Sequence, residues 1–455
     1  MDNRTDLIII GGGPGGYHAA IHAAKAGLRV TLIERAHLGG TCLNMGCIPT
    51  KTLAHTAELM HHIHHCAPLG IDCAAPAVNL AQVMAHKDEV IMQLREGIAS
   101  LMASSKVEVI QGEASFVDDH TIEVNGDTLT APHIIIATGS VPKMLPLQQA
   151  DAAMLLDSTD ILSLTALPSR LCIVGAGVIG MELACIFHSF GCQVTVIEFL
   201  KECLPALDSD IAKRLRKALE KRGIQFVMQA AVKSVADGFV TYERKGKEEQ
   251  TAADKVLMAV GRAVNIASLH LERTGIEYSA KGIATDDHLQ TNIQGVYAIG
   301  DVNGRQMLAH AASAQAEVAV HHILTASLQE EAVASLLPQL EVMPAAIFTY
   351  PEAACVGMTE DSCKAAGTDY GCCKSFHRAN GKALSMNETE GMLKILYDKS
   401  SGNLLGCHAF GAHSADMVQE IASLMCRHTT IDQLAAIIHI HPTLGELVQD
   451  AAKTK

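Results

Sequence analysis

Residues 5–34, TDLIIIGGGPGGYHAAIHAAKAGLRVTLIE, decide the fold of this chain. The stretch opens with a continuous apolar run, which is typical of a strand buried in a parallel sheet. The glycines Gly11, Gly13 and Gly16 follow, then a helical stretch, and then a second apolar strand that ends at Glu34. Glycines at this spacing let the backbone approach a pyrophosphate at a helix N-terminus, and the terminal acid accepts ribose hydroxyls. We therefore predict a dinucleotide-binding βαβ unit.

The same pattern occurs a second time, in residues 171–198, LCIVGAGVIGMELACIFHSFGCQVTVIE. The two copies align without a gap at a constant offset of 164 residues, so that Glu34 corresponds to Glu198. The second copy has its fingerprint glycines at Gly175, Gly177 and Gly180. Two complete units predict two dinucleotides bound at once. Because the carboxylate of Glu198 repels a 2′-phosphate, the second unit is predicted to prefer NAD to NADP, although Lys201 lies close by.

A pair of cysteines lies in residues 39–51, GGTCLNMGCIPTK. Cys42 and Cys47 are five positions apart, so an ideal helix does not place them on one face and irregular backbone is needed to join their sulfurs. A disulfide formed there is small, strained and exchangeable. The preceding glycine pair permits a tight turn, and the proline after Cys47 suits the first turn of a following helix. We interpret the pair as a redox-active dithiol.

The composition excludes several classes of partner. The 455 residues are 49% hydrophobic and 18% charged, which suffices for the cores of several domains. The formal net charge is −14 and no block of Lys or Arg occurs, which argues against nucleic acid or an anionic membrane as partner. No apolar run predicts a membrane span, and no secretory or transit pattern opens the chain. The 14 cysteines lack the spacing of a secreted disulfide framework, so a reducing cytoplasmic location is expected.

Outside the repeat, strands and helices alternate. The stretch HIIIATGS (133–140) is an apolar strand that ends in a small-residue turn. The strand VYAIGD (296–301) places an acid at its carboxyl end, where ligands bind in open α/β sheets. From about residue 342 the pattern changes to strands and two helices, which indicates a separate α+β domain. We predict an α/β protein with two Rossmann-like dinucleotide-binding domains and a C-terminal α+β domain.

Histidines near the end of the chain supply a candidate base. The stretch IHIHPTLGELVQD (438–450) contains His439, His441 and Glu446. A dithiol enzyme needs a base that holds or returns the thiol proton, and a neighbouring carboxylate can orient such a histidine.

Two further clusters are predicted to have structural roles. The sequence HHIHHC (61–66) ends a helix predicted over 55–66. Only His61 with His64 or His65 has the spacing of one helix face, so a polar face is favoured and no metal site is predicted. Adjacent cysteines rarely form a relaxed disulfide, so Cys372 and Cys373 are interpreted as structural.

Together the motifs resemble those of the FAD-dependent pyridine nucleotide–disulfide oxidoreductases, and within that family most closely the dihydrolipoyl dehydrogenases. The resemblance extends over essentially the whole chain, and the order and spacing of its motifs are highly specific. The motifs are GGGPGG (11–16), GGTCLNMGCIPTK (39–51), IIIATGS (134–140), VGAGVIGMELA (174–184), VGR (260–262), YAIGD (297–301), MLAH (307–310) and HIHPTLGE (439–446). The family commonly has a GRxPN stretch where this chain has GRAVN (261–265).

The resemblance implies four segments and two cofactors. The segments are an FAD-binding domain with the redox disulfide (1–145), an NAD-binding domain (146–265), a second part of the FAD-binding domain (266–335) and a C-terminal dimerisation domain (336–455). The implied FAD-site residues are Gly11, Gly13, Gly16, Glu34, Lys51, Gly112, Thr138, Gly139, Asp301 and Ala309. The implied residues of the NAD site are Gly175, Gly177, Gly180, Glu198 and Gly261, with Glu182 as the acid that pairs with Lys51 beside the flavin.

The resemblance also implies the catalytic roles. Cys42 is similar to the thiol that meets the substrate, Cys47 to the thiol beside the flavin, and His441 to the acid–base that Glu446 orients. In the family this histidine comes from the other subunit, which implies an obligate homodimer. The implied reaction reoxidises dihydrolipoamide on a lipoyl-bearing protein of a 2-oxo acid dehydrogenase or glycine cleavage complex, and reduces NAD to NADH.

Three alternatives compete with this interpretation. A glutathione-type reductase shares the dithiol and the HPT…E ending but normally binds NADPH through basic residues where this chain has Glu198. A mercuric reductase would have adjacent cysteines within residues 440–455, and this chain has none there. A non-catalytic flavoprotein scaffold would be expected to lack Cys42, Cys47 or His441, and the chain retains all of them.

Overall fold

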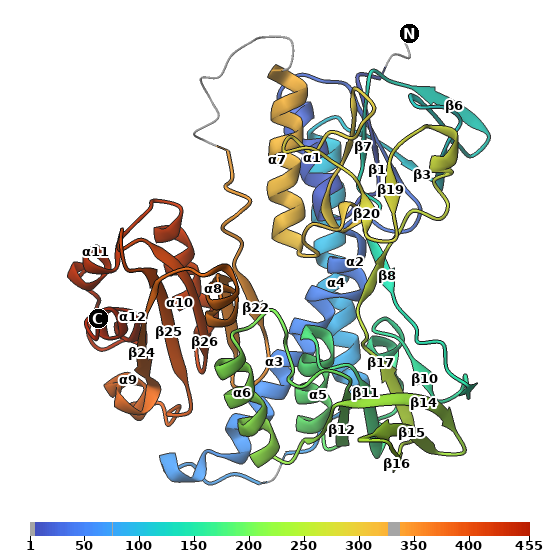
Figure 1. Cartoon of the computed structure of the whole chain (residues 1–455). Coiled ribbons are helices and arrows are strands. Elements are labelled where there is room, and N and C mark those ends of the chain that lie inside the picture. Colours follow the sequence, from blue (N-terminus) through green and yellow to red (C-terminus); the bar gives the residue numbers. More distant parts are fainter. Residues whose placement is uncertain (1–4, 75, 326–336) are drawn as a thin grey trace. The chain divides into compact units, whose positions relative to one another are not determined.

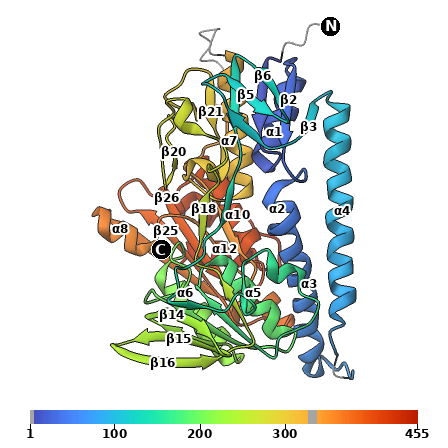
Figure 2. The same cartoon turned by 90° about the vertical axis from the view of Figure 1, so that its right-hand side faces the viewer.

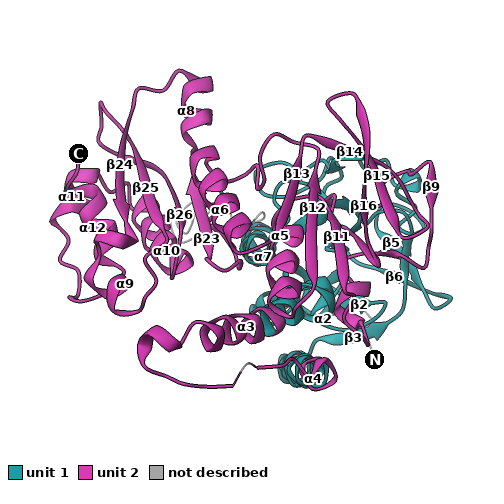
Figure 3. Ribbon diagram, turned by 90° about the horizontal axis from the view of Figure 1, so that it is seen from below, with its two compact units in different colours: residues 1–52, 84–143, 262–340 teal, residues 53–83, 144–261, 341–455 magenta. Residues whose placement is uncertain are grey.

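The structure is a computed structural model that describes residues 5–74, 76–325 and 337–455 (Figure 1). The chain divides into two compact units, each assembled from three separate stretches of sequence (Figure 3). Within the described residues, unit 1 takes its members from 1–52, 84–143 and 262–340, and unit 2 from 53–83, 144–261 and 341–455.

Unit 1 contains a five-stranded parallel sheet in the order β21-β7-β1-β2-β3, with bounds Val296–Ala298, His133–Ile136, Leu7–Ile10, Val30–Glu34 and Glu108–Gln111. Successive side chains of a strand point to opposite faces. Leu7 and Ile9 therefore pack with helices α1 (Pro14–Lys25) and α7 (Ala309–Thr325). Ile8 and Ile10 pack on the other face with a small antiparallel sheet of β4, β5 and β6 (Ala114–Phe116, Thr121–Val124 and Asp127–Thr130).

Unit 2 contains a second parallel sheet in the order β10-β17-β11-β12-β13, with bounds Leu155–Leu156, Lys255–Met258, Arg170–Val174, Gln193–Glu198 and Gln225–Met228. Strands β17-β11-β12-β13 have the same connectivity as β7-β1-β2-β3, whereas the edge strand β10 precedes the other strands in sequence and its counterpart β21 follows them. Helix α5 (Val178–Ser189) packs against β11 and β12. The apolar core of the opposite face is shared with the sheet of β16, β15, β14 and β9 (Lys247–Ala252, Phe239–Arg244, Ala230–Ala236 and Gln149–Ala150).

The predicted repeat is confirmed at the level of single residues. Helices α1 and α5 begin and end at positions that are 164 residues apart. The residue before α1, Gly13, has φ −72° and ψ −174°, and its counterpart Gly177 has φ −77° and ψ −174°. The two turns therefore have the same backbone conformation.

Three helices connect the first unit's strands β2 and β3. They are α2 (Gly40–Met45), α3 (Cys47–His64) and the long α4 (Leu80–Ser104), which is seen along its length in Figure 2. The helix predicted over 55–66 is thus the second half of α3. Nothing in the sequence pattern predicted α4, because apolar Met92, Leu94 and Leu101 are exposed on it and obscure the period of its buried face.

The C-terminal region of unit 2 is the predicted α+β domain. Its antiparallel sheet has the order β22-β23-β26-β25-β24, with bounds Ala345–Ile347, Ala353–Gly357, Leu404–Phe410, Met392–Asp398 and Tyr370–Phe376. One face shares a core with helices α10, α11 and α12 (Ser414–Met425, Ile431–Ala436 and Glu446–Ala452). The remaining helices of this region are α8 (Glu360–Ala366) and α9 (Gly381–Ser385).

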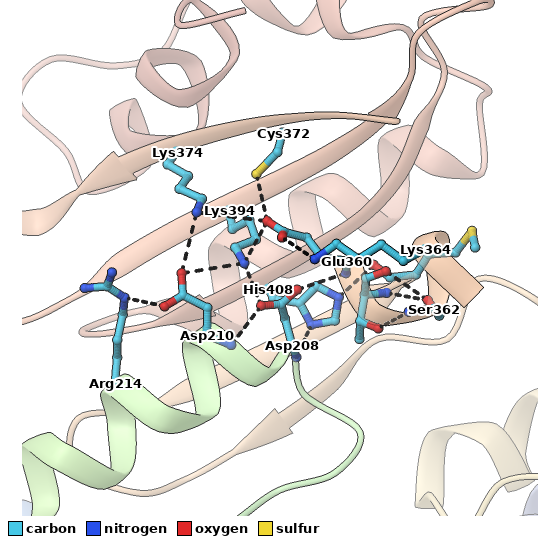
Figure 4. Close-up of polar contacts among 12 residues, drawn as sticks. Asp208, Asp210, Arg214, Glu360, Ser362, Lys364, Cys372, Lys374, Lys394 and His408 are labelled. Atoms are coloured by element: carbon cyan, nitrogen blue, oxygen red, sulfur yellow. Dashed lines mark hydrogen bonds and ion pairs between the residues drawn. The ribbon is translucent and has the colours of Figure 1, made fainter. Parts of the chain in front are cut away.

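A buried lysine joins this sheet to α6 (Ser209–Lys221) within unit 2 (Figure 4). Lys394 of β25 is 1% exposed, and its Nζ lies 2.6 Å from Oδ1 of Asp208 and 3.1 Å from Oε1 of Glu360. Asp208 caps α6 by accepting the Asp210 amide, and its own amide donates to Nδ1 of His408. We call Asp208, Asp210, Glu360 and Lys394 the Lys394 anchor.

Lys394 and Asp208 of the anchor stabilise each other in the charged form. Burial by itself raises the pKa of Asp208, but hydrogen bonds from Lys394 and from the Glu360 amide outweigh it and the pKa is lowered. The pKa of Lys394 is correspondingly raised by its carboxylate partners, against the effect of its burial. Both groups are therefore charged at neutral pH, which makes the anchor a buried ion pair.

Short elements complete the fold. Strands β8 (Ser140–Pro142) and β18 (Arg262–Val264) form one antiparallel pair, and β19 (Tyr278–Ser279) and β20 (Gly282–Ile283) form another. The 3-10 helices are η1 (Ala67–Leu69), η2 (Asp160–Ser163), η3 (Leu271–Arg273), η4 (Gly300–Asn303) and η6 (His377–Ala379). Among the described helices, none combines the length and the apolar content needed to cross a bilayer.

Candidate active site

The glycine turn of unit 1 leaves backbone N–H groups available at the start of α1. A Cβ on Gly16 would lie 1.8 Å from the carbonyl oxygen of Gly11, so only glycine permits this approach of turn and helix. No side chain caps the N-terminus of α1. Uncapped N–H groups at a helix N-terminus attract phosphate. The turn therefore fits the pyrophosphate of a dinucleotide.

Glu34 is held at the end of β2 by the turn itself. Its Oε2 accepts the amide of Gly12 at 2.7 Å, and its Oε1 accepts the amide of Ala36 at 2.8 Å. The amide of Gly112 donates to the carbonyl of Glu34 at 3.0 Å, which places that predicted residue at the end of β3, next to the acid. Two backbone hydrogen bonds thus fix the carboxylate beside the turn.

The second unit repeats these contacts. Oε2 of Glu198 accepts the amide of Ala176 at 2.6 Å, and its Oε1 accepts the amide of Leu200 at 2.7 Å. A Cβ on Gly180 would lie 2.0 Å from the carbonyl oxygen of Gly175. No side chain caps α5. The second turn therefore fits a second dinucleotide for the same physical reasons.

The dithiol segment is packed directly on the first glycine turn. The amide of Gly39 donates to the carbonyl of Gly12 at 2.8 Å. A Cβ on Gly40 would lie 2.6 Å from Cα of Gly13, and the φ angles of Gly39 and Gly40 are +95° and +55°. Both glycines are thus required, by close approach and by backbone conformation.

The two thiols meet at a break between helices, as the sequence predicted. Cys42 lies in α2, Cys47 is the first residue of α3, and Gly46 between them has φ −146° and ψ −110°, outside the helical region. In the structure both cysteines are thiols and are hydrogen-bonded to each other. A thiol at a helix N-terminus is favoured as a thiolate.

The surroundings of Cys42 keep its proton shared. The hydrogen bond with Cys47 raises the pKa of Cys42, and burial raises it further, while the positive charge of Lys51 lowers it. Cys42 is therefore the sulfur that keeps its proton when the pair loses one.

Sequence reasoning missed the residue that fixes this segment. Nδ2 of Asn44 donates to the carbonyls of Leu38 and Gly40 at 3.1 and 2.8 Å, and Nε of Arg95 donates to Oδ1 of Asn44 at 2.6 Å. Asn44 lies inside the dithiol motif and could have been singled out as a polar residue between two cysteines. Arg95 lies on α4, 51 residues away, and no local signal points to it.

Asp301 lies in a hydrogen-bonded group with two residues that the sequence did not assign. Oγ of Ser140 donates to Oδ2 of Asp301 at 2.5 Å, and Nε of Arg262 donates to Oγ of Ser140 at 2.7 Å. Asp301 belongs to η4, directly before the helix that Ala309 begins. These residues hold the acid of the YAIGD motif in place at the carboxyl end of the first sheet.

The GRAVN stretch begins at Gly261 and pairs with the small-residue turn. Oγ1 of Thr138 donates to the carbonyl of Asn265 at 2.7 Å, and the Asn265 amide donates to the carbonyl of Gly139 at 2.9 Å. Val264 pairs with Ser140 in the β18–β8 ladder. Gly261 itself has φ +103° and open space where a Cβ would stand.

His441 and Glu446 form the predicted pair. Nδ1 of His441 lies 2.9 Å from Oε1 of Glu446, and the amide of Thr443 donates to Oε2 of the same carboxylate at 2.9 Å. The Thr443 amide and then His441 lower the pKa of Glu446, so the carboxylate stays ionised. The imidazole of His441 is 80% exposed, and Nε2 is left as its reactive nitrogen. His439 differs, because its Nε2 lies 2.9 Å from Glu420 and its side chain is 8% exposed.

Glu182 is the buried acid of α5. It is 3% exposed, and its Oε1 accepts the amide of Phe348 at 2.9 Å. Glu182 belongs to unit 2, whereas Lys51 belongs to unit 1.

The histidine cluster at the end of α3 has a packing role. The rings of His61 and His65 stack with centroids 4.0 Å apart, and His61 also lies 4.3 Å from the ring of Tyr350. Burial, followed by Arg222 and the neighbouring histidines, lowers the pKa of His61 to about 3, so the ring is neutral. Across residues 5–74, 76–325 and 337–455, no group of three or more His, Cys, Asp or Glu could hold a metal ion.

The other cluster is also structural. Cys372 and Cys373 are consecutive residues of β24, the first exposed and the second buried in the core against α10 to α12. Neighbouring residues of a strand point to opposite faces, so these two sulfurs do not meet.

Two protein-family models match consecutive regions of this chain. Residues 5–316 match the family model described as pyridine nucleotide-disulphide oxidoreductase. Residues 343–452 match the model of that family's dimerisation domain. The two models together cover both parallel sheets and the antiparallel C-terminal sheet.

Individual relatives match over nearly their full length. The dihydrolipoyl dehydrogenase of Bacillus subtilis is 38% identical over 462 residues, covering 99% of this chain and 96% of that protein. Dihydrolipoyl dehydrogenase 2 of Haloarcula marismortui is also 38% identical, with 98% and 96% covered. Among solved structures, the HOCl-induced flavoprotein disulfide reductase RclA from Escherichia coli superimposes with a TM-score of 0.86 at 30% identity, covering 98% of this chain and 99% of that one.

Proposed function

Since this chain belongs to the pyridine nucleotide–disulphide oxidoreductase family, we propose that it oxidises dihydrolipoamide with NAD through a Cys42–Cys47 disulfide. It is an oxidoreductase that acts on sulfur groups and uses FAD and NAD. The observation that supports the reaction most directly is the dithiol itself, hydrogen-bonded, close to the charge of Lys51 and packed on the first glycine turn.

The thiol chemistry follows from the two cysteines. In the oxidised enzyme, one thiolate of the substrate attacks Sγ of Cys42, the Cys42–Cys47 bond breaks, and Cys47 leaves as a thiolate. The second substrate thiol then attacks the mixed disulfide, releases Cys42, and leaves as the cyclic disulfide. Each product sulfur has lost one electron and one proton, so two electrons stay on the enzyme dithiol and two protons must be removed.

The protein residues assist these steps by orientation and charge. His441 accepts a substrate proton at Nε2 while Glu446 holds Nδ1 and stabilises the imidazolium. Cys47 at the start of α3 is stabilised as the thiolate. Bound FAD supplies the two-electron link between a thiol pair and a nicotinamide. We assign its site to Gly11, Gly13, Gly16, Glu34, Lys51, Gly112, Thr138, Gly139, Asp301 and Ala309, and the NAD site to Gly175, Gly177, Gly180, Glu198 and Gly261 with Glu182 at the flavin edge.

A homodimer accounts for the exposure of the histidine segment. Ile438 and Ile440 are 92% and 79% exposed, next to the exposed His441, and they lie in the region that matches the dimerisation model. Burial of these two isoleucines against a second protomer would remove their apolar surface from water. We propose that each protomer's His441 serves the dithiol of the other.

The partners and location are part of the same proposal. The lipoyl substrate is attached to a protein of a 2-oxo acid dehydrogenase or glycine cleavage complex, and neither nucleic acid nor membrane takes part. We propose a cytoplasmic location, because the 14 cysteines lack the spacing of a secreted disulfide framework. The domains we propose are 1–145, 146–265, 266–335 and 336–455, of which the last boundary lies outside the described residues.

A glutathione-type reductase or another disulfide reductase is the second candidate. It is favoured by the likeness to RclA, whose name describes a disulfide reductase. Glu198 argues against an NADPH enzyme, because its carboxylate occupies the end of β12 where a 2′-phosphate would need positive charge.

A paired assay on the purified holoenzyme separates the candidates. One reaction contains NAD with dihydrolipoamide, and the other contains NADPH with oxidised glutathione. Rapid formation of NADH in the first reaction alone supports the proposal. Activity in the second reaction alone would overturn both the substrate and the coenzyme while leaving the dithiol chemistry in place.

A further inference from the structure

A second pair of thiols lies beyond the other end of α3. Cys66 follows the last residue of that helix by two positions, and its Sγ lies 3.4 Å from Sγ of Cys73. Cys73 is exposed and Cys66 is partly exposed, so reagents in solution reach the pair. Neither cysteine belongs to the dithiol motif or to the residues of the proposed reaction.

The loop between these cysteines brings their sulfurs to one point. Sγ of Cys66 donates to the carbonyl of Ile63 at 3.0 Å, and Sγ of Cys73 lies 3.6 Å from the same oxygen. The chain reverses through η1 and Gly70, whose φ of +79° is available to glycine without strain. The amide of Gly70 closes the turn on the carbonyl of Ala67 at 3.0 Å. The convergence is therefore held by the backbone.

The observed separation suits oxidation better than metal binding. A disulfide needs the sulfurs to approach to about 2.05 Å, which is a movement of little more than 1 Å from the present distance. Two thiols already close together lose little chain entropy when they join, so the internal disulfide is favoured over two mixed disulfides. The described residues supply no third ligand that would make a metal site here.

The position after α3 disfavours the thiolate form of this pair. Carbonyl groups at a helix C-terminus have partial negative charge, which disfavours a thiolate nearby. The hydrogen bond with Cys66 raises the pKa of Cys73, because the bonded proton is shared between the two sulfurs. Alkaline pH is therefore expected to accelerate oxidation of this pair.

We propose that Cys66 and Cys73 form a second, reversible disulfide of this protein, made by exchange with small aliphatic disulfides. One thiolate attacks a sulfur of the external disulfide R–S–S–R and displaces the first RSH. The other thiol attacks the mixed disulfide and displaces the second RSH. Two electrons and two protons pass from Cys66 and Cys73 to the external disulfide, so the step balances without a cofactor. The oxidation state of Cys66 and Cys73 then depends on the ratio of dithiols to disulfides in the surrounding solution.

Trypsin separates the two thiol pairs, which makes the proposal directly testable. Cleavage after Arg35, Lys51 and Lys87 places Cys42 and Cys47 in peptide 36–51, and Cys66 and Cys73 in peptide 52–87, with no other cysteine in either. The holoenzyme is reduced with dithiothreitol, desalted, incubated with oxidised glutathione, quenched in acid, alkylated with iodoacetamide and digested. Mass spectrometry then reports each pair independently.

We expect peptide 52–87 to lose both alkylation sites together with two hydrogens, and to regain both sites after dithiothreitol. In Cys66→Ser the remaining Cys73 should instead take up glutathione, while dihydrolipoamide turnover stays at the wild-type rate. Cys372→Ser, at an exposed cysteine elsewhere, should leave peptide 52–87 unchanged. The proposal is overturned if peptide 52–87 stays doubly alkylated when peptide 36–51 is fully oxidised. Glutathione adducts without the internal disulfide in the wild-type protein would overturn it as well.

Discussion

The two dinucleotide units of this chain share one frame, and they differ in the segment that comes after it. In both, a glutamate at the end of the second strand accepts two backbone amides, and the chain then returns to the glycine turn. In unit 1 the returning residue is Gly39, which donates to Gly12; in unit 2 it is Leu204, which donates to Ala176 at 2.9 Å. From there the first copy enters the dithiol segment and the second enters the Lys394 anchor.

The two copies differ in the segment that follows the second strand and its glutamate. Gly12 and Ala176 are equivalent residues of the repeat, so the same backbone carbonyl receives both returning segments. The first segment approaches through two glycines and ends in the partly buried thiols of Cys42 and Cys47. The second passes through Leu204, which is 2% exposed, and ends in a buried ion pair. Our proposal is therefore that the βαβ frame binds a dinucleotide in each copy, and that the following segment serves catalysis in the first copy and attachment to the C-terminal sheet in the second.

The largest expected effect is on catalysis by the first segment. Cys42→Ser should reduce dihydrolipoamide turnover by about 10³-fold or more, because it removes the attacked sulfur. The yellow colour of bound flavin should persist, since the glycine turn is untouched. Cys73→Ser is the matched control and should turn over normally. Normal turnover of Cys42→Ser would show that the dithiol takes no part in the reaction, and the first segment would then have no catalytic role that distinguishes it from the second.

The second segment is tested through its buried charge. Lys394→Met should lower the free energy of unfolding by about 3–5 kcal/mol, because it leaves Asp208 buried without its partner. Lys399→Met removes a lysine paired with Asp369 in water and should cost less than about 1 kcal/mol. Urea unfolding followed by circular dichroism measures both. Equal small losses in the two variants would show that the anchor contributes nothing to unit 2.

Acid should remove the same contribution in the wild-type protein. The pKa of Asp208 in the folded state is lowered, so the stability it contributes is complete above the ordinary aspartate pKa of about 3.9 and is lost as pH falls through the folded value. Urea midpoints measured across that acidic range should fall more steeply for the wild type than for Lys394→Met. Parallel curves would contradict the assignment of the titration to the anchor.

Gly40→Ala tests the close approach that only the first copy contains. The new Cβ would lie 2.6 Å from Cα of Gly13 at a φ of +55°, so overpacking adds to backbone strain and should cost at least about 2 kcal/mol. Gly126→Ala also has a positive φ, +87°, but open space around the added carbon, and should cost about 1 kcal/mol. Thermal unfolding and flavin retention measure both. A larger loss of stability in Gly126→Ala than in Gly40→Ala would mean that backbone strain, and not the contact with Gly13, determines the cost at Gly40.

The smallest expected effect is on the selectivity between NAD and NADP, which we attribute to Glu198, the counterpart of Glu34. Glu198→Ala combined with Phe199→Arg should shift the ratio of kcat/KM for NADP over NAD by about tenfold, which corresponds to about 1.4 kcal/mol. Glu198→Gln removes the charge and keeps one of the two oxygens that accept the Ala176 and Leu200 amides, whereas Glu198→Ala removes the charge and both acceptors. Equal shifts in these two single variants would indicate charge repulsion, and a larger shift in Glu198→Ala would indicate support of the loop. Unchanged selectivity in all variants would mean that Glu198 does not determine the selectivity.

Much of the candidate site was predictable because it lies within short motifs. The glycine turns, Cys42 with Cys47, and His441 with Glu446 each join residues a few positions apart, so spacing alone indicates their geometry. The contacts that hold these motifs in place join distant residues. Ser140 and Asp301 are 161 positions apart, and Asp208 and Lys394 are 186 apart. No periodicity or motif indicates such pairs.

The sequence by itself determined the two βαβ units with their glycine turns, the dithiol segment and the C-terminal α+β region. These features depend on local sterics, since a glycine at a positive φ, an apolar strand and a helix N-terminus act over a few residues. Only the tertiary structure decided which distant residues support them: Arg95 on Asn44, Ser140 on Asp301, and Lys394 on Asp208. It also brought Cys66 to Cys73 through a turn whose conformation the spacing did not indicate. Such contacts form when separate elements pack together, so packing and not local propensity selects them.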